Sequence, residues 1–558
     1  MTVFPIPKQT GTHADTFAAV GLAELLSRCH ISVRLDDTGA EYRVVADEEV
    51  TESHLRRVGN DPGYLYLVPN EKERAKTPAA IGDRYFDYPR EKERFDLWKE
   101  AAAQRKGASS ETAEEIEGQK PDSLFQHYRV LNLVQGDGPL NKAAAEIRKL
   151  DPADWTPRVY SSLQALAERR TASIGFDTEL VQMFSPLAAK GYARLKPDST
   201  GRGDKTKDAW ADSFLDWLRF QGFFSASIGF LLGKDIRVLT VEPKRIGYGY
   251  FAAVMTALRD VRLGGANVRV DCLGTLGVAR ALVAHAVDHP DEYGEPAELV
   301  GGIAITHYQS LGSAKAVTGL SRLCVPGWYP LRSAEDAANW IEALDEHERC
   351  LRRLDDSISD ELQLLVLYRR HLEHRGPGTE FRLAEFLEGY GIYLIRKRGQ
   401  DDWRFRQFSL PIFEAIMATY GSYSDILNNR GFQAVALALR ASTVSAQSMK
   451  RNKRDFREIR YDILPELRRK RSLPKSDEFL DALADFVASY NAESAKRLEQ
   501  GKGTGIARVA DDDFAAFVSL IERDRSPAVV GALLCAYATC KAGQEADGDK
   551  SPDSTKED

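Results

Sequence analysis

Residues 181–224 read VQMFSPLAAKGYARLKPDSTGRGDKTKDAWADSFLDWLRFQGFF, and the interpretation of the chain begins with this stretch. Its first half, through residue 207, is rich in Lys, Arg and Gly, which is typical of a loop. Its second half, residues 210–224, has the spacing of an amphipathic helix. The side chains expected on the apolar face of that helix are Trp210, Phe214, Trp217 and Leu218.

Length and composition are those of a soluble globular protein. The 558 residues allow two to four domains, and 43% hydrophobic with 28% charged residues is ordinary. No apolar run reaches the roughly 20 residues that cross a bilayer. The N-terminus has no basic segment followed by an apolar one, and the six cysteines form no CxxC pair. We therefore expect a reduced, cytoplasmic protein without a membrane segment.

Charge is distributed unevenly along a chain whose net charge is −7. Residues 541–558 carry three positive and six negative charges, and residues 333–362 carry ten acids and three arginines. Residues 444–471, in contrast, carry ten Lys or Arg and four acids. A mildly acidic whole with basic segments suits a subunit of a larger assembly better than a free-standing DNA-binding protein.

The N-terminal part is predicted to be an α+β or α/β domain over residues 1–332. Residues 14–26 have a helical pattern, and residues 42–45 and 64–68 alternate as strands do. Residues 70–122 form a charged insertion that is poor in large apolar side chains.

The second half of this domain is predicted to alternate strands and helices. The strand patterns lie at residues 235–241, 268–272 and 299–306, with a helix at 251–259 and another before residue 289. Such alternation indicates βαβ-type connections.

The remainder of the chain is predicted to be helical. A connector over 333–410 begins at Ser333, with Asp336 at capping-box spacing. An all-α bundle follows over 411–542, and residues 543–558 are expected to be a disordered acidic tail.

Three local patterns refine this part. Residues 403–408 are a short strand candidate, and Ser526-Pro527 has the composition of a helix start. The apolar residues expected on one helix face are Phe479, Leu483, Phe486 and Tyr490.

The loop between residues 190 and 207 is the first candidate binding segment. Three glycines in it allow close approach of the backbone, but the spacing is not that of a P-loop. A solvated surface loop is the alternative. The six cations that could contact phosphates are Lys190, Arg194, Lys196, Arg202, Lys205 and Lys207.

Residues 449–471 are the second candidate. Read as a helix, their cations form one stripe and their apolar residues another, until Pro465 kinks or ends the helix. The alternative is a solvated face with intrahelical pairs such as Arg454–Glu458. The predicted backbone-binding cations are Lys450, Lys453, Arg454, Arg457, Arg460, Arg468 and Arg469.

Turns at predicted strand ends give a third, weaker candidate. Lys244 and Arg245 follow one strand, and Lys315 follows another. Ligands often lie at strand ends in α/β folds, although a surface turn explains these residues equally.

Nothing in the sequence predicts catalysis, a metal or a cofactor. His285 and His289 share a helix face, as do His371 and His374, but neither pair has further ligands at metal-binding spacing. We therefore predict no catalytic residue, no metal site and no cofactor.

Several passages resemble the large subunit of type I CRISPR Cascade surveillance complexes. They are GTHADTFAAVGLAELL at 11–26, the stretch 182–224, and HYQSLGSAKAVTGLSRL at 307–323. The region from YDILPELRRK at 461–470 to residue 493 is similar to the small-subunit-like bundle fused to some large subunits. The pattern is closest to the A/B-like branch of that family.

The resemblance implies a non-catalytic protein that acts within a ribonucleoprotein. Its partners would be a CRISPR guide RNA, target double-stranded DNA, backbone and small Cascade subunits, and a helicase–nuclease that it helps to recruit. It would recognise the short motif beside the target, while base pairing with the guide reads the sequence.

Other interpretations stay open at this point. A nuclease with dispersed carboxylates and a protein–protein scaffold are the two rival functions. Met417 is in addition a possible internal start that would produce a helical piece of small-subunit size, residues 417–558.

Overall fold

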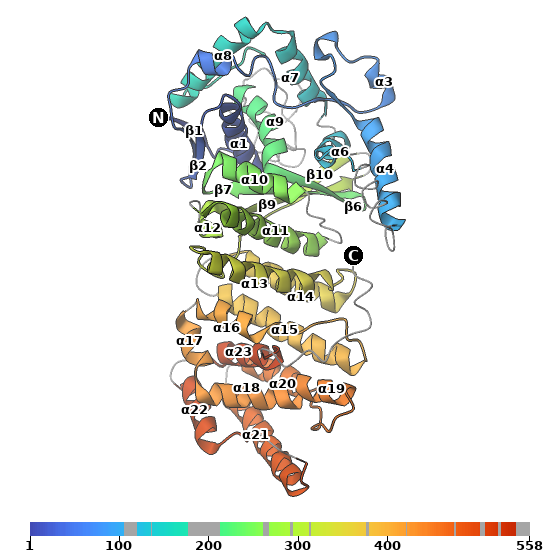
Figure 1. The fold of residues 1–558 in the computed structure, drawn as a ribbon, viewed down its shortest axis with the longest axis vertical. Coiled ribbons are helices and arrows are strands. Elements are labelled where there is room, and N and C mark those ends of the chain that lie inside the picture. Colours follow the sequence, from blue (N-terminus) through green and yellow to red (C-terminus); the bar gives the residue numbers. More distant parts are fainter. Residues whose placement is uncertain are drawn as a thin grey trace. The chain divides into compact units, whose positions relative to one another are not determined.

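The computed structural model describes residues 1–104, 120–134, 137–176, 213–259, 267–290, 294–311, 314–374, 379–419, 421–473, 476–502, 508–522 and 526–542. The chain divides into two compact units. The first is Met1–Leu263 with Gly277–Val325, and the second is Gly264–Leu276 with Pro326–Asp549. Strands lie in the first unit, and the second is helical, so the predicted fold class is confirmed (Figure 1).

Two four-stranded sheets form the framework of the first unit. One has the order β1-β3-β2-β8, and the other has the order β10-β9-β7-β6. The strands of the first sheet are β1 (Thr2–Pro7), β2 (Val33–Asp37), β3 (Glu41–Ala46) and β8 (Arg245–Gly247). Those of the second are β6 (Ser227–Leu232), β7 (Asp235–Pro243), β9 (Val300–Leu311) and β10 (Ala314–Leu323).

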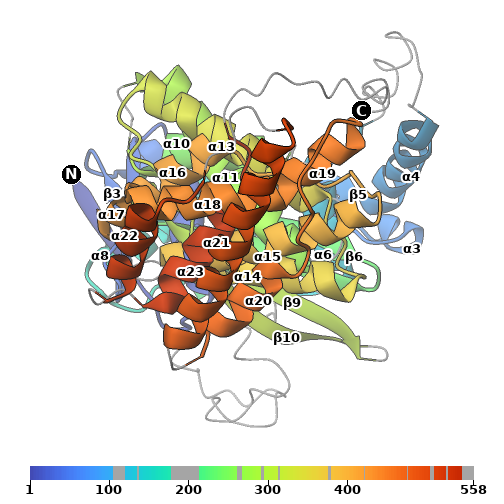
Figure 2. The same ribbon diagram turned by 90° about the horizontal axis from the view of Figure 1, so that it is seen from below.

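Every pairing within these two sheets is antiparallel, so the predicted βαβ connections are wrong. A hairpin or a long return can join antiparallel strands, and β9 and β10 form such a long hairpin (Figure 2). A parallel pair occurs in the small sheet of β4 (Tyr66–Val68) and β5 (Tyr85–Asp87).

Two helices form the centre of the first unit. Helix α1 (His13–Arg28) packs along α9 (Ser213–Ala226) and also contacts strands of both large sheets. All residues of α9 from Phe214 to Phe224 are buried, including Asp216 and Arg219, whose side chains pair at 2.6 Å. The helix is therefore buried all round, with its charged pair enclosed, and is not the half-exposed amphipathic helix that was predicted; Trp210 lies outside the described residues.

The other helices of the first unit surround this centre. They are α2 (Glu52–Leu55), α3 (Glu71–Arg74), η1 (Ala79–Ile81), α4 (Tyr88–Gln104), α6 (Phe125–Leu133), α7 (Asp137–Lys149), α8 (Pro152–Ala167), α10 (Tyr248–Arg259) and α12 (Pro296–Leu299).

Helix α11 (Asn267–Asp288) corrects the strand predicted at residues 268–272. The run of Val and Arg has the composition of a strand, but the Asp356 carboxylate accepts the backbone N–H groups of Val268 and Arg269 at 2.8 and 3.2 Å. These are helix-terminal donors without an intrahelical partner. Asp356, which is distant in the sequence, thus caps the first turn of α11 and favours a helix over a strand at these residues.

The second unit consists of helices packed in succession. They are α13 (Ala334–Arg352), α14 (Ser359–Leu372), α15 (Thr379–Gly399), α16 (Leu410–Ala418), α17 (Gly421–Leu427), α18 (Arg430–Ser442), α19 (Val444–Arg451), α20 (Ile463–Arg471), α21 (Ser476–Glu499), α22 (Asp511–Glu522) and α23 (Pro527–Thr539).

Local signals predicted several of these helices correctly. Ser333 accepts the Asp336 N–H at the start of α13, and Ser526 accepts the Ala528 N–H at the start of α23. The four apolar residues predicted on one face of α21 are all buried. The strand predicted at residues 403–408 is wrong, because these residues form an irregular connection.

Candidate nucleic-acid interface

The first candidate segment lies outside the described residues. This applies to Lys190, Arg194, Lys196, Arg202, Lys205 and Lys207, and also to the side chain of Lys315. Their binding roles stay predictions.

The strand-end pair is on the surface of the first unit. The Lys244 Nζ lies 2.7 Å from a Glu298 carboxylate oxygen, and Arg245 is exposed in β8. Since the sheets are antiparallel, the rule that ligands lie at the ends of parallel strands gives this turn no support. An exposed ion pair such as Lys244–Glu298 contributes about 1 kcal/mol or less.

The predicted continuous helix over 449–460 is wrong. Helix α19 ends at Arg451, and Lys453 has a φ of 54° in the left-handed region. The Lys453 N–H donates to the Lys450 carbonyl, and the Arg454 N–H donates to the Met449 carbonyl. This is the Schellman pattern that closes a helix, and residues 454–460 then continue without helical structure.

The cations of this segment consequently separate into two groups. Lys450, Lys453 and Arg454 are exposed, and no ion pair is found for them in the part of the chain that is described. They remain available to a ligand.

The second group packs against α21. Arg457 is 6% exposed and donates to the Ser494 hydroxyl at 2.6 Å, with its guanidinium 4.0 Å from the centre of the Tyr490 ring. Arg460 is half-buried, donates to the Ser489 hydroxyl and lies over Phe486. Both arginines therefore attach the segment after α19 to α21, and their guanidiniums are already engaged within the protein.

The basic residues of helix α20 also fall into an exposed group and a group that is engaged within the protein. Arg469 is exposed, whereas Arg468 lies 3.5 Å from the fully buried Glu388 carboxylate. Arg471, which was not predicted as a site residue, pairs with both oxygens of Glu388. Burial raises the pKa of Glu388, and the two guanidiniums oppose that shift. This cluster joins α15 to α20.

A basic surface that sequence reasoning missed lies at the end of α15. Arg396, Lys397 and Arg398 occupy its last turn, and Trp403 follows in the next connection. The guanidinium carbons of Arg398 and Arg451 lie 4.9 and 4.5 Å from the centre of the Trp403 ring. Trp403 thus brings the C-terminal ends of α15 and α19 together, and these helices are neighbours in Figure 1.

We call this region the α15–α19 basic surface. Its cations are Arg396, Lys397, Arg398, Arg404, Lys450, Arg451, Lys453 and Arg454. Asp360 pairs with Arg396 and Asp402 pairs with Arg404, so acids offset part of the charge. The signal that could have located the surface is the run IRKRGQDDWR at 395–404, in which a basic helix end meets a tryptophan.

The histidines and acids of the described residues could in principle serve other chemistry. No group of three or more His, Cys, Asp or Glu side chains is placed to hold a metal ion there. His285 and His289 stack on each other at 4.1 Å, and His285 stacks on Tyr250. Burial lowers the pKa of His347 to about 3, so this histidine is neutral at physiological pH.

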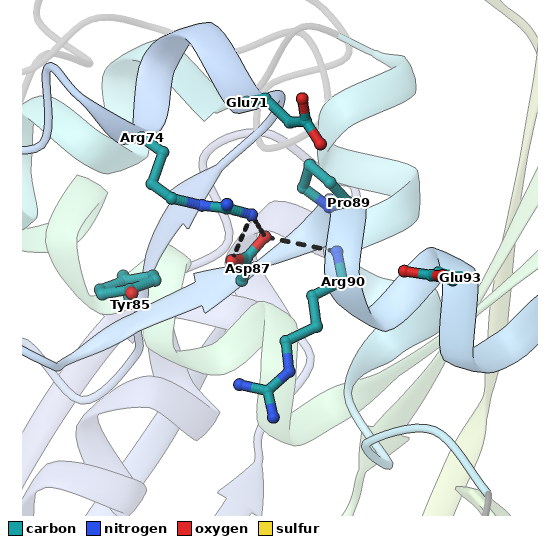
Figure 3. Close-up of a pocket in the computed structure, with 7 residues that line it drawn as sticks. All are labelled: Glu71, Arg74, Tyr85, Asp87, Pro89, Arg90 and Glu93. Carbon is teal, nitrogen blue, oxygen red and sulfur yellow. Dashed lines mark hydrogen bonds and ion pairs between the residues drawn. The ribbon is translucent and has the colours of Figure 1, made fainter.

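A shallow polar pocket lies on the first unit, between α3, β5 and the start of α4 (Figure 3). Arg74 reaches Asp87, which also accepts the Arg90 backbone N–H. Because the Asp87 carboxylate already pairs with Arg74, we assign no ligand to this pocket. Its lining residues are Glu71, Arg74, Tyr85, Asp87, Pro89, Arg90 and Glu93.

One helical segment in the described part of the chain, Val268–Asp288, is long and apolar enough to cross a membrane. Most of its apolar window, 78%, is buried inside the protein. This is the behaviour of a core helix.

Comparison with known proteins adds no assignment. Neither a scan against protein-family models nor a search of curated proteins found a match to this chain.

Proposed function

We propose that this protein is a non-catalytic, nucleic-acid-binding subunit of a CRISPR RNA-guided surveillance complex. The observation that supports it best is the α15–α19 basic surface, on which two arginines lie over a tryptophan and exposed cations flank them at two helix ends. Mobile cations beside aromatic rings suit binding to a nucleic-acid backbone without changing it. The negative ends of the two helix dipoles favour cations at this position.

The finer parts of the proposal rest on the sequence resemblance. In this role the chain binds guide RNA and target DNA, recognises the adjacent motif and helps to recruit the helicase–nuclease in the cytoplasm. Backbone and small subunits of the complex are its protein partners. The engagement of Arg457 and Arg460 with α21 narrows the set of phosphate contacts that the C-terminal unit provides.

Charge reversal on this surface tests the proposal. The K450E/K453E variant of the full chain should bind labelled single- and double-stranded DNA more weakly than the wild type. The slope of log affinity against log salt concentration should fall by about one for each phosphate that the variant no longer neutralises. Fluorescence anisotropy over a salt series measures both quantities.

The matched control is K72E/K99E, which changes net charge equally at two exposed lysines of the first unit. It should bind as the wild type does, and all variants should keep the wild-type melting temperature. If both double variants weakened DNA binding equally, the loss would be explained by net charge alone, and this would contradict the proposal. Metal-dependent cleavage of the DNA by the pure chain would favour the nuclease instead.

A further inference from the structure

The Trp403 ring is held in place by the way α15 ends. Asp401 has a φ of 64°, its N–H donates to the Arg398 carbonyl, and the Asp402 N–H donates to the Lys397 carbonyl at 2.9 Å. This is the same Schellman closure that ends α19. The Trp403 indole N–H then donates to the Asp401 carboxylate at 2.9 Å, which sets the direction of the ring.

The ring in turn organises two cations from different helices. Arg398 belongs to α15 and Arg451 to α19, and their guanidinium carbons lie 4.9 and 4.5 Å from the ring centre. A buried hydrogen bond from Gln447 to the Ile395 carbonyl, 2.8 Å long, fixes the two helix ends relative to each other. Each guanidinium therefore has its own attractive contact with the indole ring, and Trp403 holds both arginines at the ends of their helices.

An exposed aromatic ring lies beside this arrangement. Tyr461 is 44% exposed, and its ring lies so close to Gly399 that a Cβ built there would come within 2.8 Å of it. Gly399 directly follows Arg398, so the phenol ring lies at the same end of α15 as Arg398 and Trp403. An exposed aromatic ring near cations is a combination that binds unpaired nucleotides, because bases stack while the backbone is neutralised.

We propose that Arg398, Trp403, Arg451 and Tyr461 form a site for an unpaired nucleotide. Arg398 and Arg451 contact its phosphates, Tyr461 stacks on its base, and Trp403 is a positioning residue that acts through the two arginines. Duplex DNA keeps its bases stacked internally, so Tyr461 contributes to single-strand binding alone. The inference rests on the proposed function, since it presumes that the α15–α19 basic surface meets nucleic acid.

The test uses the full chain with a labelled 20-nucleotide oligothymidine and a blunt duplex of equal length. Y461L should weaken binding of the single strand about fivefold or more, in line with the loss of one stacked base, and leave duplex binding unchanged. W403L should weaken binding of both probes, and W403F should weaken it less, because an aromatic face remains for the two arginines. W403L should add nothing in an R398A/R451A background. Melting temperatures establish that each variant is folded.

The outcomes separate this inference from the proposed function. If the wild type binds neither probe, both fall. If K450E/K453E weakens binding but Y461L and W403L do not, the proposed function stands and the site is overturned. Equal loss on both probes in Y461L contradicts base stacking, and an additive effect of W403L in the arginine-free background contradicts positioning. Should W403L not fold, the exposed Tyr461 still decides the matter.

Discussion

At the scale of single residues, burial decides what a basic side chain does. Arg454 and Arg457 are three positions apart, yet Arg454 is exposed and Arg457 is 6% exposed against Tyr490 and Ser494. A buried guanidinium without partners costs several kcal/mol, so the aromatic face and hydroxyl that surround Arg457 are structural requirements. Arg457 therefore stabilises the fold and is withdrawn from the predicted phosphate contacts.

The pKa of Glu346 yields a prediction for stability. Burial, more than any other cause, raises this pKa to about 7, while the Ser409 N–H that donates to the carboxylate at 2.8 Å opposes the shift. Between pH 4.5, the ordinary pKa of a glutamate, and about pH 7, Glu346 therefore keeps its proton in the folded protein but loses it in the unfolded chain. The stabilisation that results is complete below pH 4.5 and is lost as pH rises to about 7.

We expect E346Q to match the wild type at pH 4 and to exceed it at pH 8. The gain in free energy of unfolding should reach at most roughly 3 kcal/mol, because the amide avoids an ionised buried carboxylate. Chemical denaturation at both pH values measures it. A pH-independent difference between the two proteins would contradict the assignment.

At the scale of elements, one helix crossing controls the first unit. A Cβ at Gly21 of α1 would lie 1.9 Å from the Leu218 carbonyl oxygen, and one at Gly222 of α9 would lie 1.8 Å from the Phe17 carbonyl oxygen. Each glycine thus lets its own helix touch the backbone of the other. Backbone atoms cannot move aside as a flexible side chain can, so the contact requires glycine on both helices.

G222A should therefore destabilise the first unit by at least about 3 kcal/mol, since the helices must separate. Urea unfolding followed by circular dichroism measures the loss. G249A is the matched control, because Gly249 is the second residue of α10 and no atom lies within 4 Å of a Cβ built there. It should be neutral or stabilising by up to about 1 kcal/mol. Similar behaviour of the two variants would show that the crossing is adaptable.

At the scale of the whole molecule, helices from both sides of the predicted boundary at residue 411 pack against each other in the second unit. Helix α23 packs most extensively against α15, and Arg471 of α20 pairs with Glu388 of α15. Met417, the suggested internal start, is fully buried near the end of α16. A piece that begins there lacks α15 and exposes the surface that α15 covers.

We expect residues 417–558 alone to unfold without a cooperative transition, because Arg471 loses its buried partner and α23 its main packing surface. A piece that begins at residue 379 retains both and should melt cooperatively. Differential scanning calorimetry of the two pieces makes the comparison. Cooperative melting of the shorter piece would restore the idea that it is a separate small subunit.

Short-range patterns in the amino-acid chain were enough to predict several features correctly. Serine caps located the starts of α13 and α23, helical spacing identified the buried face of α21, and the change from mixed to helical structure followed from periodicity. These features depend on residues within a few positions of one another, so a single chain suffices to predict them.

Tertiary packing decided where helices begin and end and which basic side chains face solvent. Asp356 turned a strand-like run into the start of α11, a left-handed Lys453 ended the predicted basic helix, and α21 buried Arg457. Trp403 joined two basic helix ends that lie far apart in the sequence. Each of these outcomes depends on a partner that is distant along the chain or on a left-handed residue that ends a helix. Hydrophobic periodicity in the sequence reveals neither of these causes.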